Sequence, residues 1–311
     1  MALLTLLLRC SGGRVEAAHL EHGLRGDASA ADARFVRDHC QRVGVRCHIR
    51  YARVGDCRRR GESSEAAGRR LRYEFLVEIA RDRELPFIAT GHNVEDRVET
   101  VLFNLFRGTG LAGLAGIPEV TRFDFAPDRA VVRPLIDCTR GDLRLYLAAR
   151  EIPWREDGTN DENLYSRNRI RNELLPWVRR NLNQRAEEVL TGLARECDAL
   201  NASIEAEARE KLGAIAVEFP VALAAWDIRA ARRLPVEQLS HLIRSQGRAL
   251  SLPVLDRCRT LELCGLIRRS GRWRFQWAGD IEVCAAKPLL GWVRRDDIAL
   301  WRAHAARWVS G

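Results

Sequence analysis

The sequence of 311 residues has almost no lysine. Of its 51 Lys and Arg residues only Lys211 and Lys287 are lysines, so guanidinium groups carry nearly all of the positive charge. With 42 Asp and Glu residues, the formal net charge is +9. Such an excess of arginine favours a polyanionic partner, because a guanidinium binds phosphate through two hydrogen bonds and stacks on bases. A solvated basic surface is the alternative interpretation.

Closely spaced cysteines and long apolar runs are also missing. The nine cysteines are scattered, and no two have the short spacing of a metal-binding motif. We interpret them as small buried side chains of a protein in the reducing cytoplasm. The apolar run Met1–Leu8 is too short to span a bilayer, which takes about 20 residues, so no membrane association is predicted.

The first 136 residues alternate apolar strands with amphipathic helices. This rhythm predicts an α/β fold, a parallel sheet with helices on both faces. The strands are expected at 15–20, 46–51, 86–90 and 130–135. The helices are expected at 2–9, 29–43, 64–83, 94–106 and about 140–150. Sheets of this kind bind ligands at the carboxyl ends of their strands, so the segments after the strands are the candidates for a site.

A long helical pattern follows from residue 183 to about 214, and a smaller α+β domain comes after it. We expect helices at 234–248 and 253–264 and strands at 273–278, 281–285 and 289–294. The expected division is therefore a first domain over 1–182, a linking helix over 183–215 and a small domain over 216–311. In the small domain, Trp273, Trp277 and Trp292 are expected in the core, and the arginines of its strands on RNA.

The strongest motif starts at Thr90, where a strand ends and a helix rich in acids begins. Asn93 and Asp96 have the spacing of a helix-capping pair, which is a purely structural explanation for Asp96. It does not account for Glu99, which lies away from the expected buried stripe of Val98, Val101, Leu102 and Leu105. His92, Glu99 and Thr100 form a candidate group that positions a magnesium nucleotide or relays a proton.

Two further loops have the composition of a phosphate site. Arg107-Gly108-Thr109-Gly110 ends the same helix, and its glycines can take left-handed conformations that free backbone N–H groups; a simple helix C-cap is the alternative. The segment from His19 to Gly26 follows the first strand directly and contains two histidines and an arginine.

A third motif begins at Ser166, which is expected to cap a helix whose inward positions are Ile170, Leu174 and Trp177. This register leaves Arg167 and Arg171 one turn apart, and two neighbouring guanidiniums make a good phosphate clamp. The alternative is that Asp157 or Glu173 neutralises them.

In this order and spacing, the segments resemble the tRNA(Ile)-lysidine synthases, a family of the N-type ATP-pyrophosphatase (PP-loop) group with an adenine nucleotide alpha hydrolase-like fold. The resemblance covers residues 1–185. Besides the motifs above, it is carried by Arg133-Pro134-Leu135, Trp154-Arg155-Glu156-Asp157 and the Arg-Asn-x-Ile-Arg segment that starts at Arg167.

The resemblance implies a ligase that uses ATP and Mg²⁺. The C2 oxygen of the anticodon cytidine of tRNA(Ile), whose anticodon is CAU, would attack the α-phosphate, and free L-lysine would then displace AMP. It implies catalytic roles for His92, Asp96, Glu99, Arg167 and Arg171. It implies ATP contacts for His19, His22, Gly23, Arg25, Gly91, Thr100, Arg107, Gly108 and Gly110. No residue is assigned as a direct metal ligand, and a homodimer is a further expectation.

One departure from the family concerns the Ser-Gly-Gly-x-Asp-Ser loop that wraps the ATP phosphates. The sequence begins where that loop should just have ended, so we expect an upstream strand and loop. Two alternatives stay open: a catalytically inactive tRNA-binding relative or truncated gene product, and a tRNA-thiolating ATP-pyrophosphatase. The lack of paired cysteines speaks against the second.

Overall fold

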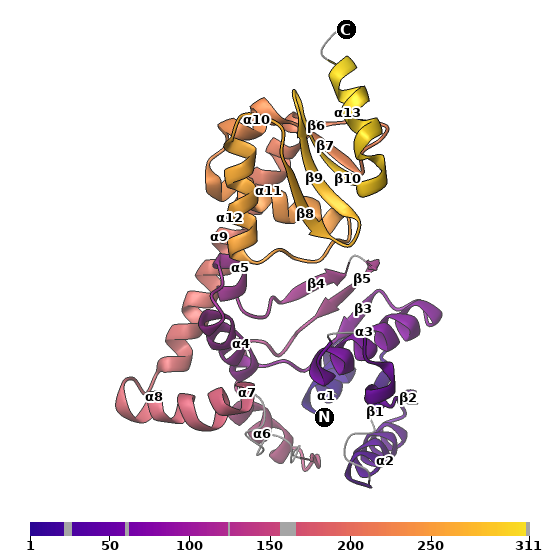
Figure 1. The fold of residues 1–311 in the computed structure, drawn as a ribbon. Helices are drawn as coiled ribbons and strands as arrows, with labels where there is room; N and C mark the ends of the chain where they lie inside the picture. Colours follow the sequence, from indigo (N-terminus) through magenta and orange to yellow (C-terminus); the bar gives the residue numbers. More distant parts are fainter. Residues whose placement is uncertain (22–26, 60–61, 124, 156–165, 309–311) are drawn as a thin grey trace. The chain divides into compact units, whose positions relative to one another are not determined.

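The structure is a computed structural model that describes residues 1–21, 27–59, 62–123, 125–155 and 166–308 (Figure 1). The chain divides into two compact units. Unit 1 comprises Met1–Phe103 and Gly116–Thr191, and unit 2 comprises Asn104–Ala115 and Gly192–Gly311. Within the described residues no helix is long and apolar enough to cross a bilayer.

The elements from the amino terminus to the long helix are mostly those of unit 1. Its strands are β1 (Ala17–Glu21), β2 (Cys47–Tyr51), β3 (Phe87–Ala89), β4 (Val120–Phe123) and β5 (Ala126–Val132). The helices are α1 (Ala2–Cys10), α2 (Asp27–Arg42), α3 (Ser64–Asp82), α4 (Val94–Phe106), α5 (Leu111–Leu114), α6 (Arg140–Ala148), α7 (Ser166–Arg169), α8 (Leu175–Asn181) and α9 (Ala186–Ile215). A 3₁₀ turn covers Val54–Cys57, and a π-helical turn covers Ile170–Leu174.

Unit 1 contains two pairs of parallel strands. β1 pairs with β2, and β3 pairs with β5, whose other edge carries β4 in the antiparallel direction. Within the described part of the chain, β1 and β3 are not neighbours in a sheet, but α3 contacts β1, β3 and β5. The predicted α/β class is confirmed. The hairpin strand β4 was missed, because its alternation is short and Val120 on it is exposed.

Helix starts follow the local hydrogen-bonding chemistry of their caps. The Ser63 hydroxyl accepts from the backbone N–H of Ala66 and caps α3. Thr139 and Asp142 form a reciprocal capping box on α6. These side chains satisfy backbone donors that have no partner within a helix, which is why both starts lie where the sequence places them.

Two of the side chains that the helical patterns place in the core are exposed. Val98, Val101 and Leu102 of α4 are buried, as the helical stripe predicts, but Leu105 is 48% exposed. Trp177 of α8 is 51% exposed, whereas Ile170 is buried. A π-helical turn inserts an extra residue into the helical register, so Leu175, and not Trp177, packs with Ile170 in one core cluster.

Unit 2 holds an antiparallel sheet of β6 (Ala216–Val217), β7 (Ala224–Asp227), β8 (Arg274–Ala278), β9 (Ile281–Ala286) and β10 (Leu289–Arg294), in the order β6-β7-β10-β9-β8. Its helices are α10 (Ile228–Arg233), α11 (Val236–Ala249), α12 (Arg257–Arg268) and α13 (Ile298–Arg307). A 3₁₀ turn covers Arg295–Asp297. The helix expected at 253–264 starts later, because Asp256 accepts from Arg259 N–H and caps it.

The sheet of unit 2 is buried on both faces. Along β10, Leu290 and Trp292 belong to the core shared with α11 and α12, whereas Leu289 and Val293 belong to the core under α13. This alternation is the two-residue period of a strand. Figure 1 shows α10, α11 and α12 on one side of the sheet and α13 on the other.

Of the tryptophans expected in this core, Trp273 is partly buried and packs against it. Trp277 and Trp292 are buried, and their ring centroids lie 6.4 Å apart. The cysteines fit their predicted role less well. Cys40, Cys197, Cys264 and Cys284 are buried, but Cys10, Cys57 and Cys258 are exposed, so the expectation that all are core side chains is wrong.

The tight packing of Trp277 gives a stability prediction with a matched control. A Cβ added to Gly247 on α11 would overlap the indole ring of Trp277, whereas one added to Gly265 on α12 would meet nothing within 4 Å. Alanine in a helix gains about 0.5–1 kcal/mol over glycine, while overpacking costs about 1–3 kcal/mol. Urea unfolding should show Gly265→Ala more stable than wild type and Gly247→Ala less stable. Two variants of equal stability would contradict the packing described for Trp277.

Candidate active site

The candidate site of unit 1 begins where β3 ends and α4 starts. The backbone N–H of Asn93 donates to Asp96 at 3.0 Å, and that of Asp96 donates to the Asn93 side chain at 3.0 Å. This reciprocal pair confirms the capping explanation for Asp96. Just before it, the Thr90 hydroxyl lies 2.9 Å from Nδ1 of His92 and fixes the orientation of the imidazole ring.

A buried ion pair joins α4 to the π-helical turn. Arg171 donates from Nε and Nη2 to the two carboxylate oxygens of Glu99, at 2.6 and 2.8 Å. The same Nη2 lies 3.4 Å from Oδ1 of Asp96. One guanidinium therefore holds two carboxylates that are three residues apart on α4. This geometry brings together the acids and the paired-arginine segment, which lie about 70 residues apart in the sequence.

Arg167 lies against the same face of α4 one turn further along. Its guanidinium carbon is 5.4 Å from the centroid of the Phe103 ring. Arg167 and Arg171 are four residues apart, as are Glu99 and Phe103, so the two helical faces match turn by turn. The alternative interpretation that Glu173 neutralises Arg171 is wrong, because Arg171 pairs with Glu99 and Glu173 forms an ion pair with Arg169.

Burial and pairing compete at this ion pair. Glu99 is 3% exposed, and its burial raises the pKa of its carboxyl, although the hydrogen bonds from Arg171 oppose the rise. Burial opposes the charge on Arg171 too, but the hydrogen bonds of Glu99 and the nearby charge of Asp96 raise the pKa of the guanidinium. Glu99 is thus a carboxylate with increased affinity for a proton.

His92 is a neutral imidazole at the end of β3. Burial lowers its pKa to about 4, the charge of Asp96 opposes this, and the charges of Arg133, Arg69 and Arg72 add to it. Arg69 and Arg72 were not among the residues expected at the site. They are three residues apart on α3, so an arginine pair one helical turn apart, on the helix that contacts β1 and β3, is the signal that could have found them.

The remaining predicted residues divide into three groups. The Thr100 hydroxyl donates to the backbone oxygen of Asp96 at 2.8 Å within α4, and Gly91 is exposed in the turn after β3. Burial lowers the pKa of His19, the middle residue of β1, and the charge of Arg72 lowers it further, as it does for His92. His22, Gly23 and Arg25 lie outside the described residues, and so does Asp157.

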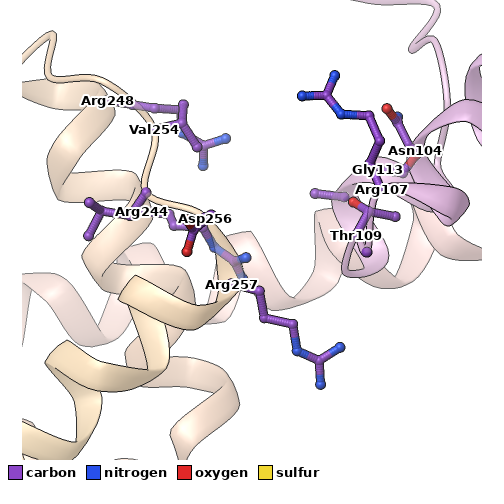
Figure 2. A pocket seen from close by; sticks show the side chains of 12 residues that line it. Asn104, Arg107, Thr109, Gly113, Arg244, Arg248, Val254, Asp256 and Arg257 are labelled. Carbon is purple, nitrogen blue, oxygen red and sulfur yellow. The ribbon is translucent and has the colours of Figure 1, made fainter. Parts of the chain in front are cut away.

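The glycine loop after α4 contributes to a different pocket. Gly108 has φ +75° and ends α4, which confirms the left-handed C-cap, but Gly110 has φ −97° and is extended. Arg107 and Gly108 line a pocket of about 360 Å³ with Arg244, Arg248 and Arg257, all within unit 2 (Figure 2). The assignment of this loop to the nucleotide stays a prediction.

The acids of α4 are the candidate contacts for a metal ion at this site. Within the described ranges, no group of three or more His, Cys, Asp or Glu side chains could hold a metal ion. Asp96 is the carboxylate of the site with the most access, because its side chain is 27% exposed against 5% for Glu99. A cation bound mainly through phosphate oxygens needs only one or two protein carboxylates, and Asp96 fits that requirement.

Comparisons with known proteins agree with these features. A family model described as PP-loop domain matches residues 1–178. The chain is 37% identical over 198 residues to a tRNA(Ile)-lysidine synthase of Clostridioides difficile, covering 63% of this chain and 42% of that protein. It is 41% identical over 185 residues to the enzyme of the same name from Chlorobaculum tepidum, covering 57% and 53%. The chain therefore spans about half the length of these relatives.

A solved structure shares the fold. The U34-tRNA thiolase of Methanococcus maripaludis matches with a TM-score of 0.50 and 15% identity, covering 63% of this chain and 68% of that one. At this identity the likeness concerns the fold alone. The family match covers more than half of the chain, including the whole of the site built on α4 and the π-helical turn. The chain belongs to the PP-loop domain family.

Proposed function

We propose that this chain acts as a tRNA(Ile)-lysidine synthase, which uses ATP to join lysine to C2 of the wobble cytidine in the CAU anticodon of tRNA(Ile). The observation that carries the proposal is the meeting of Glu99, Asp96 and Arg171 beside His92 in unit 1. The names of the relatives and the family match support the same reaction. Free L-lysine as substrate, the cytoplasm as location and a homodimer as assembly belong to the same proposal.

In the first step, the C2 oxygen of cytidine forms a bond to the α-phosphorus of ATP, and the bond to pyrophosphate breaks. Negative charge on the phosphates increases locally, so positive side chains stabilise the step. Arg69 and Arg72 fit this role, because their charges reach His92 at the carboxyl end of β3. Neutral His92, oriented by Thr90, donates or accepts a hydrogen bond without adding charge. Bound Mg²⁺ would neutralise the phosphates, with Asp96 as its protein ligand.

In the second step, the ε-amine of lysine forms the bond to C2, and the bond from C2 to the oxygen of AMP breaks. The attacking nitrogen starts as an ammonium and must lose protons. Glu99 is the acceptor best suited to this, because burial raises the pKa of its carboxyl. Arg171 is a positioning residue that orients this carboxylate through two hydrogen bonds. Asp96, which is more exposed, would attract the ammonium to the site.

The proposal predicts a large effect of Glu99→Gln on lysine incorporation. The assay mixes the chain with tRNA(Ile), ATP, Mg²⁺ and labelled lysine. A general base contributes typically about 10²–10⁴-fold to a rate, so incorporation should fall by about 100-fold or more. The matched control is Glu78→Gln, since Glu78 pairs with Arg50 in the same unit but on the surface. It should keep the rate of wild type.

Two outcomes would count against parts of this proposal. Incorporation by Glu99→Gln within about twofold of wild type would remove Glu99 from the reaction. A wild-type chain that binds tRNA but incorporates no lysine would favour the inactive tRNA-binding relative. The closed pair of Arg171 and Glu99 is the observation that fits this second candidate, because each charge already has a partner. Sulfur incorporated into tRNA would favour a thiolating enzyme.

The neutral state of His92 predicts an acid-sensitive contribution to stability. Its pKa of about 4 lies below the value of about 6.5 expected in the unfolded chain. The unfolded chain therefore binds the proton more readily between these values, so the stability that neutral His92 contributes is complete above about pH 6.5 and is lost as the pH falls through about 4. In urea unfolding, the free energy of unfolding of wild type relative to that of His92→Asn should be lower at pH 5 than at pH 7.5.

The control for this measurement is His304→Asn, because His304 is exposed on α13 of unit 2. Its stability relative to wild type should be the same at both pH values. If wild type were as stable relative to His92→Asn at pH 5 as at pH 7.5, or more stable, a buried neutral imidazole would be contradicted.

A further inference from the structure

The arginine pocket of unit 2 has no role in the chemistry proposed above. Its lining comes from two stretches of the chain, the end of α4 with its glycine loop and the α11–α12 region. Figure 2 shows Arg107, Asn104 and Thr109 on one side and Arg244, Arg248 and Arg257 on the other. Its volume of about 360 Å³ leaves room for a phosphate group and the sugar attached to it.

The lining is strongly positive. The pocket is lined by four arginines and one carboxylate, that of Asp256. This carboxylate accepts a hydrogen bond from the backbone N–H of Arg259 at 2.8 Å and caps α12. Arg248 forms an ion pair with Glu205 at 2.9 Å. The structure gives Arg244 and Arg257 no ion-pair partner among the described residues. In the described part of the chain, these two guanidiniums of the pocket therefore form no ion pair with a carboxylate, although the charge of Glu205 acts on Arg244.

The position of Arg244 is electrostatically unfavourable. It is only partly exposed, and burial lowers the pKa of its guanidinium, with the charges of Arg248 and Arg257 acting in the same direction. Like charges held close together and partly removed from water destabilise the folded chain. Groups arranged against stability in this way are frequently those that bind a ligand of opposite charge.

We propose that this pocket binds a phosphate group of the tRNA backbone through Arg107, Arg244 and Arg257. The proposal rests on the proposed function, because it takes tRNA as the substrate, and it adds a contact away from the reacting base. Guanidiniums suit phosphate because their N–H groups match its oxygens in pairs. Asn104 and Thr109 add polar groups that can bind the remaining phosphate and ribose oxygens. The glycine loop after α4 is thereby assigned to RNA.

The test compares two double variants of the full chain in tRNA binding over a range of salt concentrations. Arg244→Gln with Arg257→Gln should weaken binding about tenfold and reduce the dependence of log K on log salt by about two. The matched control is Arg294→Gln with Arg307→Gln, because these exposed arginines do not line the pocket and Arg307 lies on the helix covering the other face of the sheet. It should bind as wild type does.

A thermal melt separates a binding role from a structural one. Neutralising Arg244 removes a repelled, partly buried charge, so the melting temperature of Arg244→Gln should be unchanged or raised while tRNA affinity falls. A lower melting temperature that accompanies the loss of affinity would assign the arginine a structural role and overturn the proposal. Inorganic tripolyphosphate is the second probe. If the pocket variants lose its stabilising effect but bind tRNA as wild type does, the site is one for free polyphosphate.

The failure of this inference differs from the failure of the proposed function. Wild type that incorporates lysine, together with pocket variants that keep wild-type tRNA affinity and salt dependence, would leave the enzyme standing and overturn the pocket assignment. Wild type that binds tRNA without incorporating lysine, together with pocket variants that bind more weakly, would support the pocket and reject the reaction. Wild type without affinity for tRNA would overturn both.

Discussion

A carboxylate removed from water needs a partner of opposite charge, and in unit 1 this requirement organises the site. Glu99 on α4 is almost fully buried, and Arg171 supplies both hydrogen bonds to it. Removing one partner of a buried ion pair leaves a charge that costs about 3–5 kcal/mol. The pair thus fixes α4 against the π-helical turn. It also fixes which groups face outward, because Asp96 remains more exposed at the edge of the same guanidinium.

The second constraint is the accumulation of positive charge at the strand ends. His92 follows β3, and the charges of Arg69 and Arg72 reach it from α3. α3 contacts both parallel strand pairs, so its position determines where these two guanidiniums lie. A neutral imidazole, an acid with increased proton affinity and nearby guanidiniums are the groups that transfer of a nucleotidyl group and attack by an amine require.

In unit 2 the charged side chains are arranged differently from those in unit 1. Its apolar side chains form cores on both faces of the sheet, and Trp226, Trp292 and Trp301 are fully buried. Several of its arginines, which come from helices and loops, line one pocket together. Positive groups brought together without matching carboxylates are unfavourable unless an anion joins them. The apolar cores on the sheet stabilise unit 2, and the pocket concentrates positive charge.

Much of the architecture could be predicted, because it depends on local patterns. The limits of α4 and β10 agree with those expected, since apolar periodicity and capping residues are properties of neighbouring side chains. The resemblance implied catalytic roles for the acids of α4 and for Arg167 and Arg171 together, and in the structure Arg171 contacts Glu99 and Asp96. Trp177 and Leu105 were assigned to the wrong side because a π-helical turn and a helix end interrupt the period.

The sequence by itself determined the alternation of strands and helices, the caps, the excess of arginine and the family. Only the tertiary structure decided the partners: Arg171 pairs with Glu99 and not with Glu173, and Arg107 lines a pocket with Arg244. The physical reason is that a charge is neutralised by whichever opposite charge lies nearest in space. Packing of helices and sheets sets that distance, and neighbours in sequence do not.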